Sequence, residues 1–231
     1  MNDTVIDQWN KAADSYAGEQ ERSAFAAANR TVVKNRFKNL AGKTVLDLGC
    51  GYGYYTDYFG SISGNVIGID GSQTMINLAK RKYPNSRFFL SDLNEPLPYE
   101  KDSFDLVFCN QVLMDIENIT ELISECRRVL RPEGTFYYSI VHPAFYIGDW
   151  INDANGRKRG KVITSYITPF KSENSFWGKT THFHRPLSYY LNAASDAGLV
   201  LVHCEEPKTY DALSKNDELP LFFFAEYRKP G

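Results

Sequence analysis

The chain has 231 residues, of which 43% are hydrophobic and 23% are charged. This length and composition favour one globular domain with a sizeable core. The formal net charge of −2 argues against a basic surface for nucleic acid or anionic lipid, and no run of residues approaches the roughly 18 apolar positions that a membrane span needs.

The four cysteines lie far apart in the sequence, and none belongs to a C-x-x-C pair. This spacing argues against a zinc site and against a disulfide framework, and it fits a reducing compartment. Residues 1–20 are polar and lack the apolar core of a secretory signal. We therefore expect a cytoplasmic protein without a metal site.

Residues 1–40 are expected to be helical, because apolar side chains recur at helical spacing between Ser23 and Leu40. Beyond them, short apolar runs alternate with helical segments. The expected strands are residues 44–48, 65–70, 87–90, 104–109 and 135–141, and the expected helices are residues 54–59, 72–81 and 120–130. This alternation predicts an α/β fold with a parallel sheet covered by helices on both faces, whose strands end at one ligand-binding edge.

Residues 142–183 interrupt this alternation with glycines, many aromatic side chains and the basic run Arg157-Lys158-Arg159. A loop of this length without regular structure is uncommon and often functional. We predict a lid or substrate-shaping insertion, whose aromatic side chains either wall an acceptor pocket or anchor the loop.

The last part of the chain returns to regular structure. A helix is expected over residues 185–197, and strands over residues 199–203 and 221–227 should pair antiparallel, since only a turn-rich link joins them. We therefore expect a single domain over residues 1–231, with residues 1–40 as an N-terminal helical lid.

A glycine-rich turn follows the first predicted strand, in the order Asp47-Leu48-Gly49-Cys50-Gly51-Tyr52-Gly53. Glycines let the backbone turn tightly and approach a ligand, and the helix that begins at Tyr54 adds N–H groups that hold an anion. The spacing is G-x-G-x-G, whereas a dinucleotide fingerprint would be G-x-G-x-x-G, with its third glycine at Tyr54.

Three carboxylates follow or end the first three predicted strands. Asp70 comes about 20 residues after the turn, where it would bind a ribose diol or cap the next helix. Asp92 would accept a hydrogen bond from an adenine amine or shape a turn. Asp47 precedes the glycines and would hold a ligand's ammonium group or shape the loop.

In this order the motifs resemble those of the class I S-adenosylmethionine-dependent methyltransferases, and within them the small-molecule group related to the ubiquinone and menaquinone biosynthesis enzymes. The resemblance runs from about Trp9 to Tyr227. The motifs that carry it are Val45-Leu46-Asp47-Leu48-Gly49-Cys50-Gly51-Tyr52-Gly53, Gly68-Ile69-Asp70, Ser91-Asp92-Leu93, Phe104-Asp105-Leu106-Val107 and Val129-Leu130-Arg131-Pro132-Glu133-Gly134-Thr135.

The resemblance implies a Rossmann-like three-layer sandwich. Its seven-stranded, mostly parallel sheet would have the order 3-2-1-4-5-7-6, with strand 7 antiparallel. It also implies S-adenosyl-L-methionine as the cofactor, with the glycine loop holding its methionine part. The expected cofactor-binding residues are Tyr16, Asp47, Gly49, Gly51, Gly53, Asp70, Asp92, Leu93 and Asn110.

The resemblance also implies roles for single residues. Asp92 with Leu93 would bind the adenine, and Asn110 would offer its carbonyl to the donor's amino group. Tyr16 would lie near the donor's carboxylate or serve only for packing. The run that begins at Asn110 continues Gln-Val-Leu and lacks the Asn-Pro-Pro-aromatic signature of enzymes that methylate DNA bases or glutamine side chains. A small organic acceptor, methylated at O, N or C, is therefore expected.

Methyl transfer from a sulfonium requires alignment and the exclusion of water, and it requires a general base only if the acceptor must lose a proton. His142, after the fifth strand, and His184, after the insertion, are the catalytic candidates. As alternatives, His142 would fix the turn before Pro143 and His184 would cap or pack the lid. His182 and His203 rank below them.

The expected partner is a small-molecule substrate, with no nucleic acid and no membrane span, and a homodimer is left open. Two other functions compete with the methyltransferase. One is a non-catalytic S-adenosylmethionine-binding regulatory protein on the same fold. The other is an NAD-binding oxidoreductase, against which the glycine spacing and the terminal antiparallel pair argue.

Overall fold

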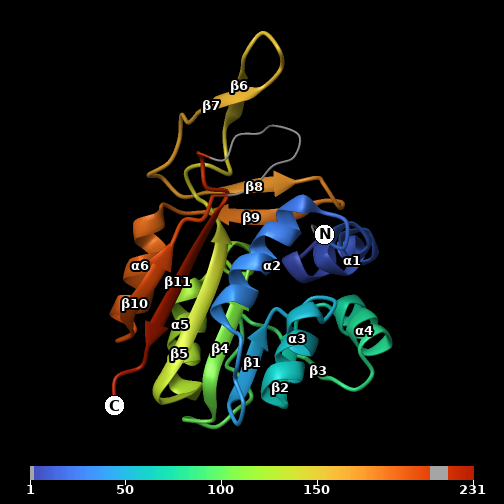
Figure 1. The fold of residues 1–231 in the computed structure, drawn as a ribbon, viewed down its shortest axis with the longest axis vertical. Helices are drawn as coiled ribbons and strands as arrows, with labels where there is room; N and C mark the ends of the chain where they lie inside the picture. Colours follow the sequence, from blue (N-terminus) through green and yellow to red (C-terminus); the bar gives the residue numbers. More distant parts are fainter. Residues whose placement is uncertain (1–2, 209–217) are drawn as a thin grey trace.

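The computed structural model describes residues 3–208 and 218–231, in which a seven-stranded sheet lies between layers of helices (Figure 1). The strands of this sheet are β1 (Thr44–Leu48), β2 (Asn65–Asp70), β3 (Arg87–Leu90), β4 (Phe104–Asn110), β5 (Leu130–Val141), β10 (Val200–Glu205) and β11 (Phe222–Arg228). The helices are α1 (Val5–Gln20), α2 (Ala24–Arg36), α3 (Tyr54–Ser63), α4 (Gln73–Lys82), the 3-10 turn η1 (Leu113–Asp115), α5 (Ile119–Val129) and α6 (Leu187–Asp196). No helix in the described ranges combines the length and the apolar character that a membrane span requires.

The sheet has the strand order β10-β11-β5-β4-β1-β2-β3. The five strands from β5 to β3 run parallel to one another, and β11 runs antiparallel to both of its neighbours, β5 and β10. With β10 and β11 counted as strands 6 and 7, this confirms the predicted order 3-2-1-4-5-7-6. The parallel strands therefore end at one edge of the sheet, where ligands bind in such folds.

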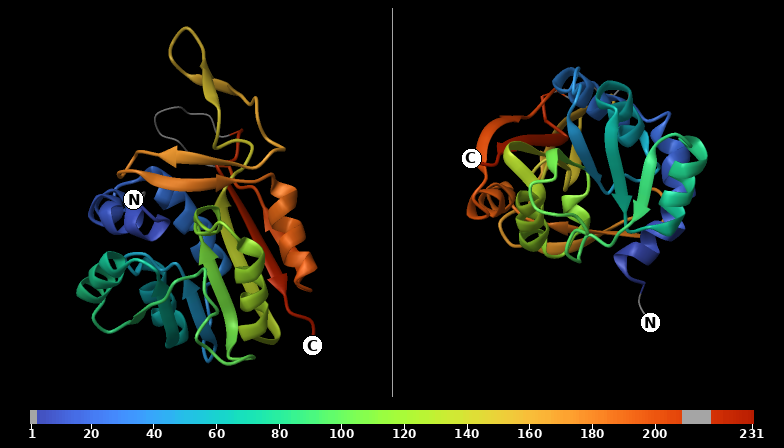
Figure 2. Two further views of the ribbon diagram at one scale, coloured as in Figure 1. Left: turned by 180° about the vertical axis from the view of Figure 1, so that it is seen from behind. Right: turned by 90° about the horizontal axis from the view of Figure 1, so that it is seen from below.

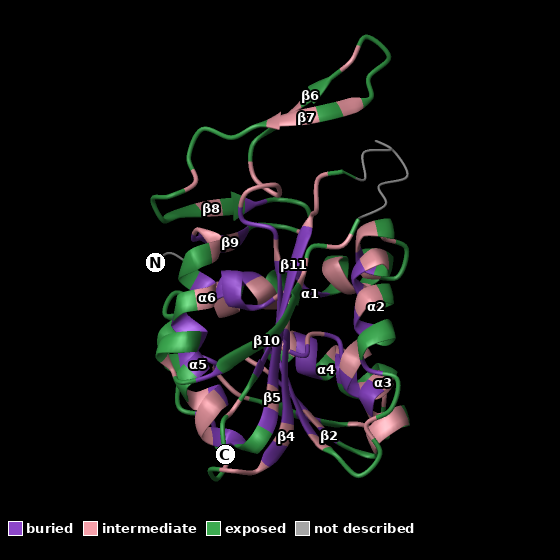
Figure 3. Ribbon diagram, turned by 60° about the vertical axis from the view of Figure 1, so that its left-hand side comes forward, coloured by how far each residue is buried: buried purple, intermediate pink, exposed green. Residues whose placement is uncertain are grey.

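Strand β1 shows how the sheet joins its two helical layers. Leu46 and Leu48 are fully buried in an apolar cluster that includes Ile123 of α5, and Val45 belongs to the opposite cluster with Phe59 of α3. Successive side chains of a strand point to opposite faces, so this short strand fixes both layers. Figure 3 shows the buried strands in the centre, with α5 and α6 on one side and α2 and α3 on the other.

The expected N-terminal helical segment consists of two helices. Thr4 is the N-cap of α1, since its Oγ1 accepts a hydrogen bond from the Asp7 N–H and the Asp7 carboxylate accepts one from the Thr4 N–H. Ser23 caps α2, because its hydroxyl accepts from the Ala26 N–H. The second cap starts a new helix in a segment whose periodicity alone suggests a single one.

Residues 142–183 correct the expectation of a loop without regular structure. They hold two antiparallel hairpins, β6 (Asp149–Asn152) with β7 (Lys158–Val162) and β8 (Phe170–Asn174) with β9 (Thr180–His184), beyond the carboxyl edge of the sheet (Figure 1). The first turn contains Asn155-Gly156, with Gly156 at φ 75°, and an Asn-Gly pair is a strong hairpin signal. Asp153 Oδ1 supports this turn by accepting from the Asn155 N–H at 2.9 Å.

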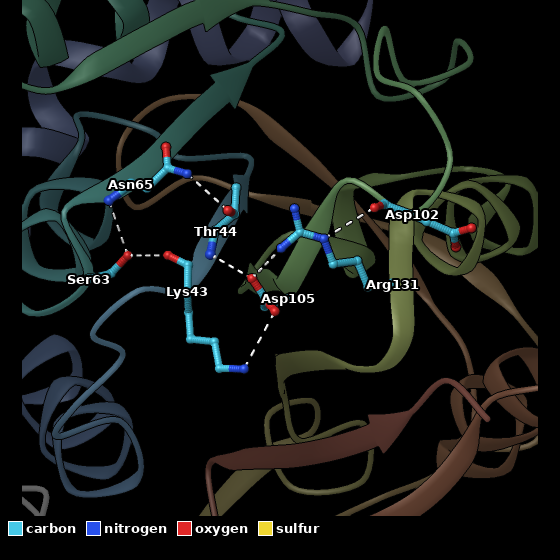
Figure 4. Close-up of polar contacts among 7 residues, drawn as sticks. All are labelled: Lys43, Thr44, Ser63, Asn65, Asp102, Asp105 and Arg131. Atoms are coloured by element: carbon cyan, nitrogen blue, oxygen red, sulfur yellow. Dashed lines mark hydrogen bonds and ion pairs between the residues drawn. The ribbon is translucent and has the colours of Figure 1, made fainter. Parts of the chain in front are cut away.

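A polar cluster joins three strands at the amino edge of the sheet, opposite the ligand-binding edge (Figure 4). Asp105 of β4 accepts hydrogen bonds from the Thr44 N–H of β1 and from Nη1 of Arg131 in β5, both at 2.8 Å. Lys43 Nζ lies 3.5 Å from the other carboxylate oxygen. One carboxylate therefore fixes β4 against both of its neighbours.

We expect Asp105→Asn to lower the free energy of unfolding by about 1–2 kcal/mol, because the amide loses the charge-assisted hydrogen bonds. Urea denaturation measures this change. Lys43→Met is the matched control, since it removes only the long, exposed ion pair and should cost less than about 0.5 kcal/mol. Equal losses in the two variants would contradict this assignment.

Candidate functional site

Two pockets lie at the carboxyl edge of the sheet and share a wall. We call the one lined by Asp70, Ser72 and Leu93 the Asp70 pocket, with about 700 Å³ of space, and the one lined by Tyr146 and Phe25 the Tyr146 pocket, with about 800 Å³; both volumes include space open to solvent. The residues that line both are Trp9, Tyr16, Gly49, Asn110, Gln111 and Asp115.

Six of the nine expected cofactor-binding residues line these pockets. They are Tyr16, Gly49, Asp70, Asp92, Leu93 and Asn110. The other three, Asp47, Gly51 and Gly53, lie behind the pocket wall or at the start of α3. The sheet edge thus brings together residues from the ends of β1, β2, β3 and β4.

The glycine loop has the conformation that glycine allows. Gly49 and Gly53 have φ values of 64° and 92°, in the left-handed region. A Cβ at Gly49 would collide with the side chain of Val112, and one at Gly53 would lie 2.6 Å from Phe88 Cζ. Gly49 also lines both pockets, and the absence of a side chain there lets the loop pack closely against Val112.

Asp70 connects the loop to the next helix. One of its oxygens accepts from the Gly51 N–H at 2.9 Å, and the other accepts from the Ser72 N–H at 2.8 Å. Burial raises the pKa of this carboxyl, and the two N–H donors oppose the shift. Ser72 is itself the N-cap of α4, since its hydroxyl accepts from the Met75 N–H. The capping role considered for Asp70 therefore belongs to Ser72.

Asp92 and Leu93 line the Asp70 pocket. Asp92 Oδ1 accepts from both the backbone and side-chain N–H groups of Asn94, at 2.9 and 2.8 Å, so it also shapes the turn. Leu93 is buried and offers an apolar surface. An acidic group beside an apolar wall suits a flat base with an exocyclic amine.

Asn110 and Tyr16 lie on the shared wall. The Asn110 side-chain oxygen accepts from the Ser139 hydroxyl at 2.6 Å, so the side chain is fixed. Tyr16 packs edge-on against Trp9 and Trp177, with ring centroids 5.3 and 4.9 Å apart. Tyr16 is therefore a packing residue that also lines both pockets.

Asp47 is placed differently from the other carboxylates. It is 2% exposed, and its Oδ2 accepts from the Thr56 hydroxyl at 2.6 Å. Burial raises its pKa to about 7, although the Thr56 hydrogen bond lowers it. This geometry matches the loop-shaping alternative rather than direct contact with a ligand.

The structure places neither catalytic candidate on the two pockets. His142 is buried, with Nε2 2.7 Å from Glu206 Oε1 and with Nδ1 accepting from the Ala144 N–H, so it fixes the turn after β5. His184 Nε2 lies 2.8 Å from the Tyr166 carbonyl oxygen. Both imidazoles hold the insertion in place, as the alternatives for them proposed.

His182, ranked below them, and Asp115, which was not a candidate, do reach the site. His182 lines the Tyr146 pocket and its Nε2 lies 3.3 Å from Asp115 Oδ1. Asp115 is 8% exposed, and Oδ1 has no hydrogen-bond partner among the described residues. Burial, and then the negative charge of Asp70, raise the pKa of Asp115, whereas burial lowers that of His182 to about 4. The sequence signal for Asp115 was a carboxylate inside an apolar run.

Arg185 fixes this pair of residues. Its buried guanidinium donates to the carbonyl oxygens of Ile116 at 2.7 Å and of Glu117 at 2.6 Å, just after η1. It also donates to the Phe183 carbonyl oxygen of β9 at 3.3 Å. Since Asp115 belongs to η1 and His182 to β9, Arg185 holds the two segments together.

Helix α1 lies between the hairpin β8–β9 and α4 (Figure 2). Gln8 Oε1 accepts from the Thr181 N–H of β9 at 2.8 Å. Asn10 Oδ1 accepts from the Ser72 hydroxyl at 2.8 Å and from the Thr74 N–H at 3.1 Å. The helix is therefore joined to both sides of the site and contributes Trp9 and Tyr16 to both pockets. Within the described ranges, no cluster of His, Cys, Asp and Glu has the arrangement of a metal site.

Comparison with known proteins agrees with this geometry. The model of a family described as a methyltransferase domain matches residues 46–138. A probable S-adenosylmethionine-dependent methyltransferase of Mycolicibacterium smegmatis is 32% identical over 122 residues, which cover 53% of this chain and 47% of that protein. The demethylmenaquinone methyltransferase of Lactococcus lactis is 37% identical over 112 residues, which cover 46% of this chain and 44% of that protein. The chain thus spans about half the length of these curated relatives.

A solved structure extends the similarity to most of the chain. The S-adenosylmethionine-dependent methyltransferase from Mesorhizobium loti has a TM-score of 0.74 and 26% identity, and the match covers 90% of this chain and 99% of that one. The fold is therefore that of the class I methyltransferases. More specifically, the chain carries an S-adenosylmethionine-dependent methyltransferase domain, with S-adenosylmethionine as the methyl donor. This assignment decides against the NAD-binding oxidoreductase.

The raised pKa of Asp47 predicts a pH-dependent stability. The folded protein holds this proton up to about pH 7, whereas the unfolded chain releases it near pH 3.8. The stabilisation is therefore complete below the unfolded pKa and is lost as the pH rises through about 7. We expect Asp47→Asn to gain stability relative to the wild type between these limits, by a few kcal/mol in order of magnitude.

Urea denaturation of the ligand-free protein at pH 4.5 and at pH 7.5, roughly the two ends of this window, measures the effect. Thr56→Val serves as the opposite variant. It removes the hydrogen bond that lowers the Asp47 pKa, so its stability should fall more steeply with pH than that of the wild type. An unchanged pH dependence in Asp47→Asn would contradict the buried-carboxyl account.

Proposed function

We propose that the protein transfers the methyl group of S-adenosylmethionine to a small organic acceptor by in-line displacement. The observation that carries this proposal is the pair of pockets that meet at a common wall. The Asp70 pocket has the features that suit an adenosyl group, and the Tyr146 pocket has space for an acceptor. A methyl group has to pass between two such molecules at their junction, where Gly49 and Asp115 lie.

The residues present fit the donor. We assign the ribose hydroxyls to Asp70, because each of its oxygens accepts one N–H and retains a lone pair. The adenine is assigned to Asp92 and Leu93, and the donor's amino group to the carbonyl of Asn110. The methionine part is assigned to the glycine loop at the junction, where Gly49 lines both pockets.

Arg30 is a further residue that we assign to the donor, at its carboxylate. Its Nη2 donates to the Tyr52 hydroxyl at 2.7 Å and to the Gln20 carbonyl oxygen at 3.0 Å. Its guanidinium also lies 4.1 Å from the centre of the Tyr54 ring. No carboxylate in the described residues pairs with it, so its charge is available on the wall of the Tyr146 pocket near the glycine loop.

The chain's own contribution is alignment and the exclusion of water. The bound donor supplies a methyl group that is already activated on a sulfonium. Correct alignment of two reactants contributes up to about 7–11 kcal/mol to a rate. Helix α1 and the hairpin β8–β9 provide this alignment, because a hydrogen bond between Gln8 and Thr181 joins them beside the pockets. We assign lid roles to these two elements.

The lining of the Tyr146 pocket supports a small acceptor. The Tyr146 pocket is lined by aromatic side chains from α1, α2, α3 and the insertion, which favours an apolar or aromatic molecule. The relative from Lactococcus lactis is named for a demethylmenaquinone acceptor. We place this chain in the same broad group of small-molecule methyltransferases.

We expect Asp70→Asn to weaken donor binding by about 10–100-fold, because hydrogen bonds to a charged group are worth about 1.5–3 kcal/mol. Titration calorimetry with S-adenosylhomocysteine measures this loss. Asp196→Asn, on an exposed site of α6, is the matched control and should bind like the wild type. A folded wild-type protein that binds NADH and no S-adenosylhomocysteine would refute the donor assignment.

A further inference from the structure

Asp115 is a buried carboxyl group that has no cationic partner in the described chain. Its side chain is about nine-tenths buried, and no Lys or Arg of the described residues forms an ion pair with it. Oδ1 lies 3.3 Å from His182 Nε2 but makes no hydrogen bond. A buried ion costs several kcal/mol unless a partner compensates for it. Burial therefore raises the pKa of Asp115, and a cation that binds beside it would stabilise the ionised form.

The position of Asp115 shows which ligand it meets. It lines both pockets, so it lies where the acceptor must approach the donor. Arg185 fixes the segment that carries it, through the carbonyl oxygens of Ile116 and Phe183. A carboxylate held in this way is preorganised for a partner, because its own segment does not have to rearrange.

The surroundings of Asp115 favour a cation. The rings of Trp9, Tyr16 and Trp177 pack together on the wall of the Tyr146 pocket, and aromatic faces attract cations. Burial keeps His182 neutral, since its pKa is about 4, so the imidazole adds no positive charge. Arg30 also lines this pocket, where it is hydrogen-bonded to Tyr52 at the glycine loop.

We infer that the acceptor is an amine, and that Asp115 is the catalytic residue that binds its ammonium form and removes the proton before methyl transfer. This inference rests on the proposed function. A primary or secondary amine with an apolar or aromatic body matches a pocket of aromatic rings around one unpaired carboxylate. A phenol or an alcohol would bring no cation, and a phenolate would be repelled by Asp115.

The step balances in protons and charge. One proton passes from the ammonium to Asp115 Oδ1, which frees the lone pair of the nitrogen. The nitrogen then forms its bond to the methyl carbon while the sulfur–carbon bond breaks, so the sulfonium becomes the neutral thioether of S-adenosylhomocysteine. The positive charge ends on the methylated nitrogen. The proton stays on Asp115 during the displacement and passes to solvent when the products leave the pocket.

The experiment measures binding to the protein saturated with S-adenosylhomocysteine. Calorimetric titrations compare amines from benzylamine to dodecylamine with the alcohols of the same carbon skeleton, and with phenol. We expect at least one amine to bind about tenfold or more tightly than its alcohol. Asp115→Asn should weaken this binding on the order of 100-fold and should change the affinity for S-adenosylmethionine and S-adenosylhomocysteine by less than about threefold.

Glu117→Gln is the matched control. It removes a carboxylate two positions away that is exposed, pairs with Lys171 and lines neither pocket, so amine binding should stay as in the wild type. Equal binding of alcohols or phenol, absence of amine binding throughout the series, or full amine binding by Asp115→Asn would overturn the inference. So would a selective loss of S-adenosylmethionine over S-adenosylhomocysteine, which would assign Asp115 to the sulfonium. A wild type that binds no S-adenosylhomocysteine would instead refute the proposed function.

Discussion

The site depends on the burial of three carboxyl groups at one edge of the sheet. Asp47, Asp70 and Asp115 lie at or just beyond the ends of β1, β2 and β4, and burial raises the pKa of all three. Asp70 also raises the pKa of the other two through their mutual repulsion. No Lys or Arg in the described part of the chain forms an ion pair with any of them. The parallel sheet thus creates a crevice whose carboxyl groups ionise more readily when hydrogen-bond donors or a cation lie beside them.

The three carboxyl groups differ in the hydrogen bonds that they accept. Asp47 is satisfied by Thr56 and stays behind the wall, so it shapes the loop. Asp70 accepts two N–H groups and keeps the lone pairs that hydroxyl groups need. Asp115 keeps one oxygen without a hydrogen bond. In the proposed function these carboxyl groups are structural, binding and reactive in turn, according to how many hydrogen-bond donors the protein supplies to each.

The sheet and the donor side could be predicted because their signals are local. The glycine turn and Asp70 follow directly from strand ends, and the topology of parallel strands brings them together. The acceptor side could not, because Asp115 lies in a short 3-10 turn and His182 lies in a hairpin about 70 residues later in the chain. The contact between Asp115 and His182 depends on Arg185 and on the register of the hairpin β8–β9. Neither can be predicted from the spacing of residues in the sequence. His142 and His184 were candidates because they flank the insertion at the end of the fifth strand and before the late helix. In the structure the imidazole of His142 contacts Glu206, and that of His184 contacts the Tyr166 carbonyl oxygen.

The place of Asp115 on the shared wall also bears on how the rate arises. In the proposed transfer the positive charge moves from sulfur to nitrogen, while Asp115 holds the proton that it took from the amine. Asp115 is then uncharged, so its contribution is to bind the ammonium and to free the lone pair of the nitrogen, which for a general base is worth roughly 10²–10⁴-fold in rate. Most of the acceleration then has to come from alignment and from the exclusion of water. The contacts that govern the rate are therefore those that hold α1 and β9 over the two pockets, through Gln8, Asn10 and Arg185.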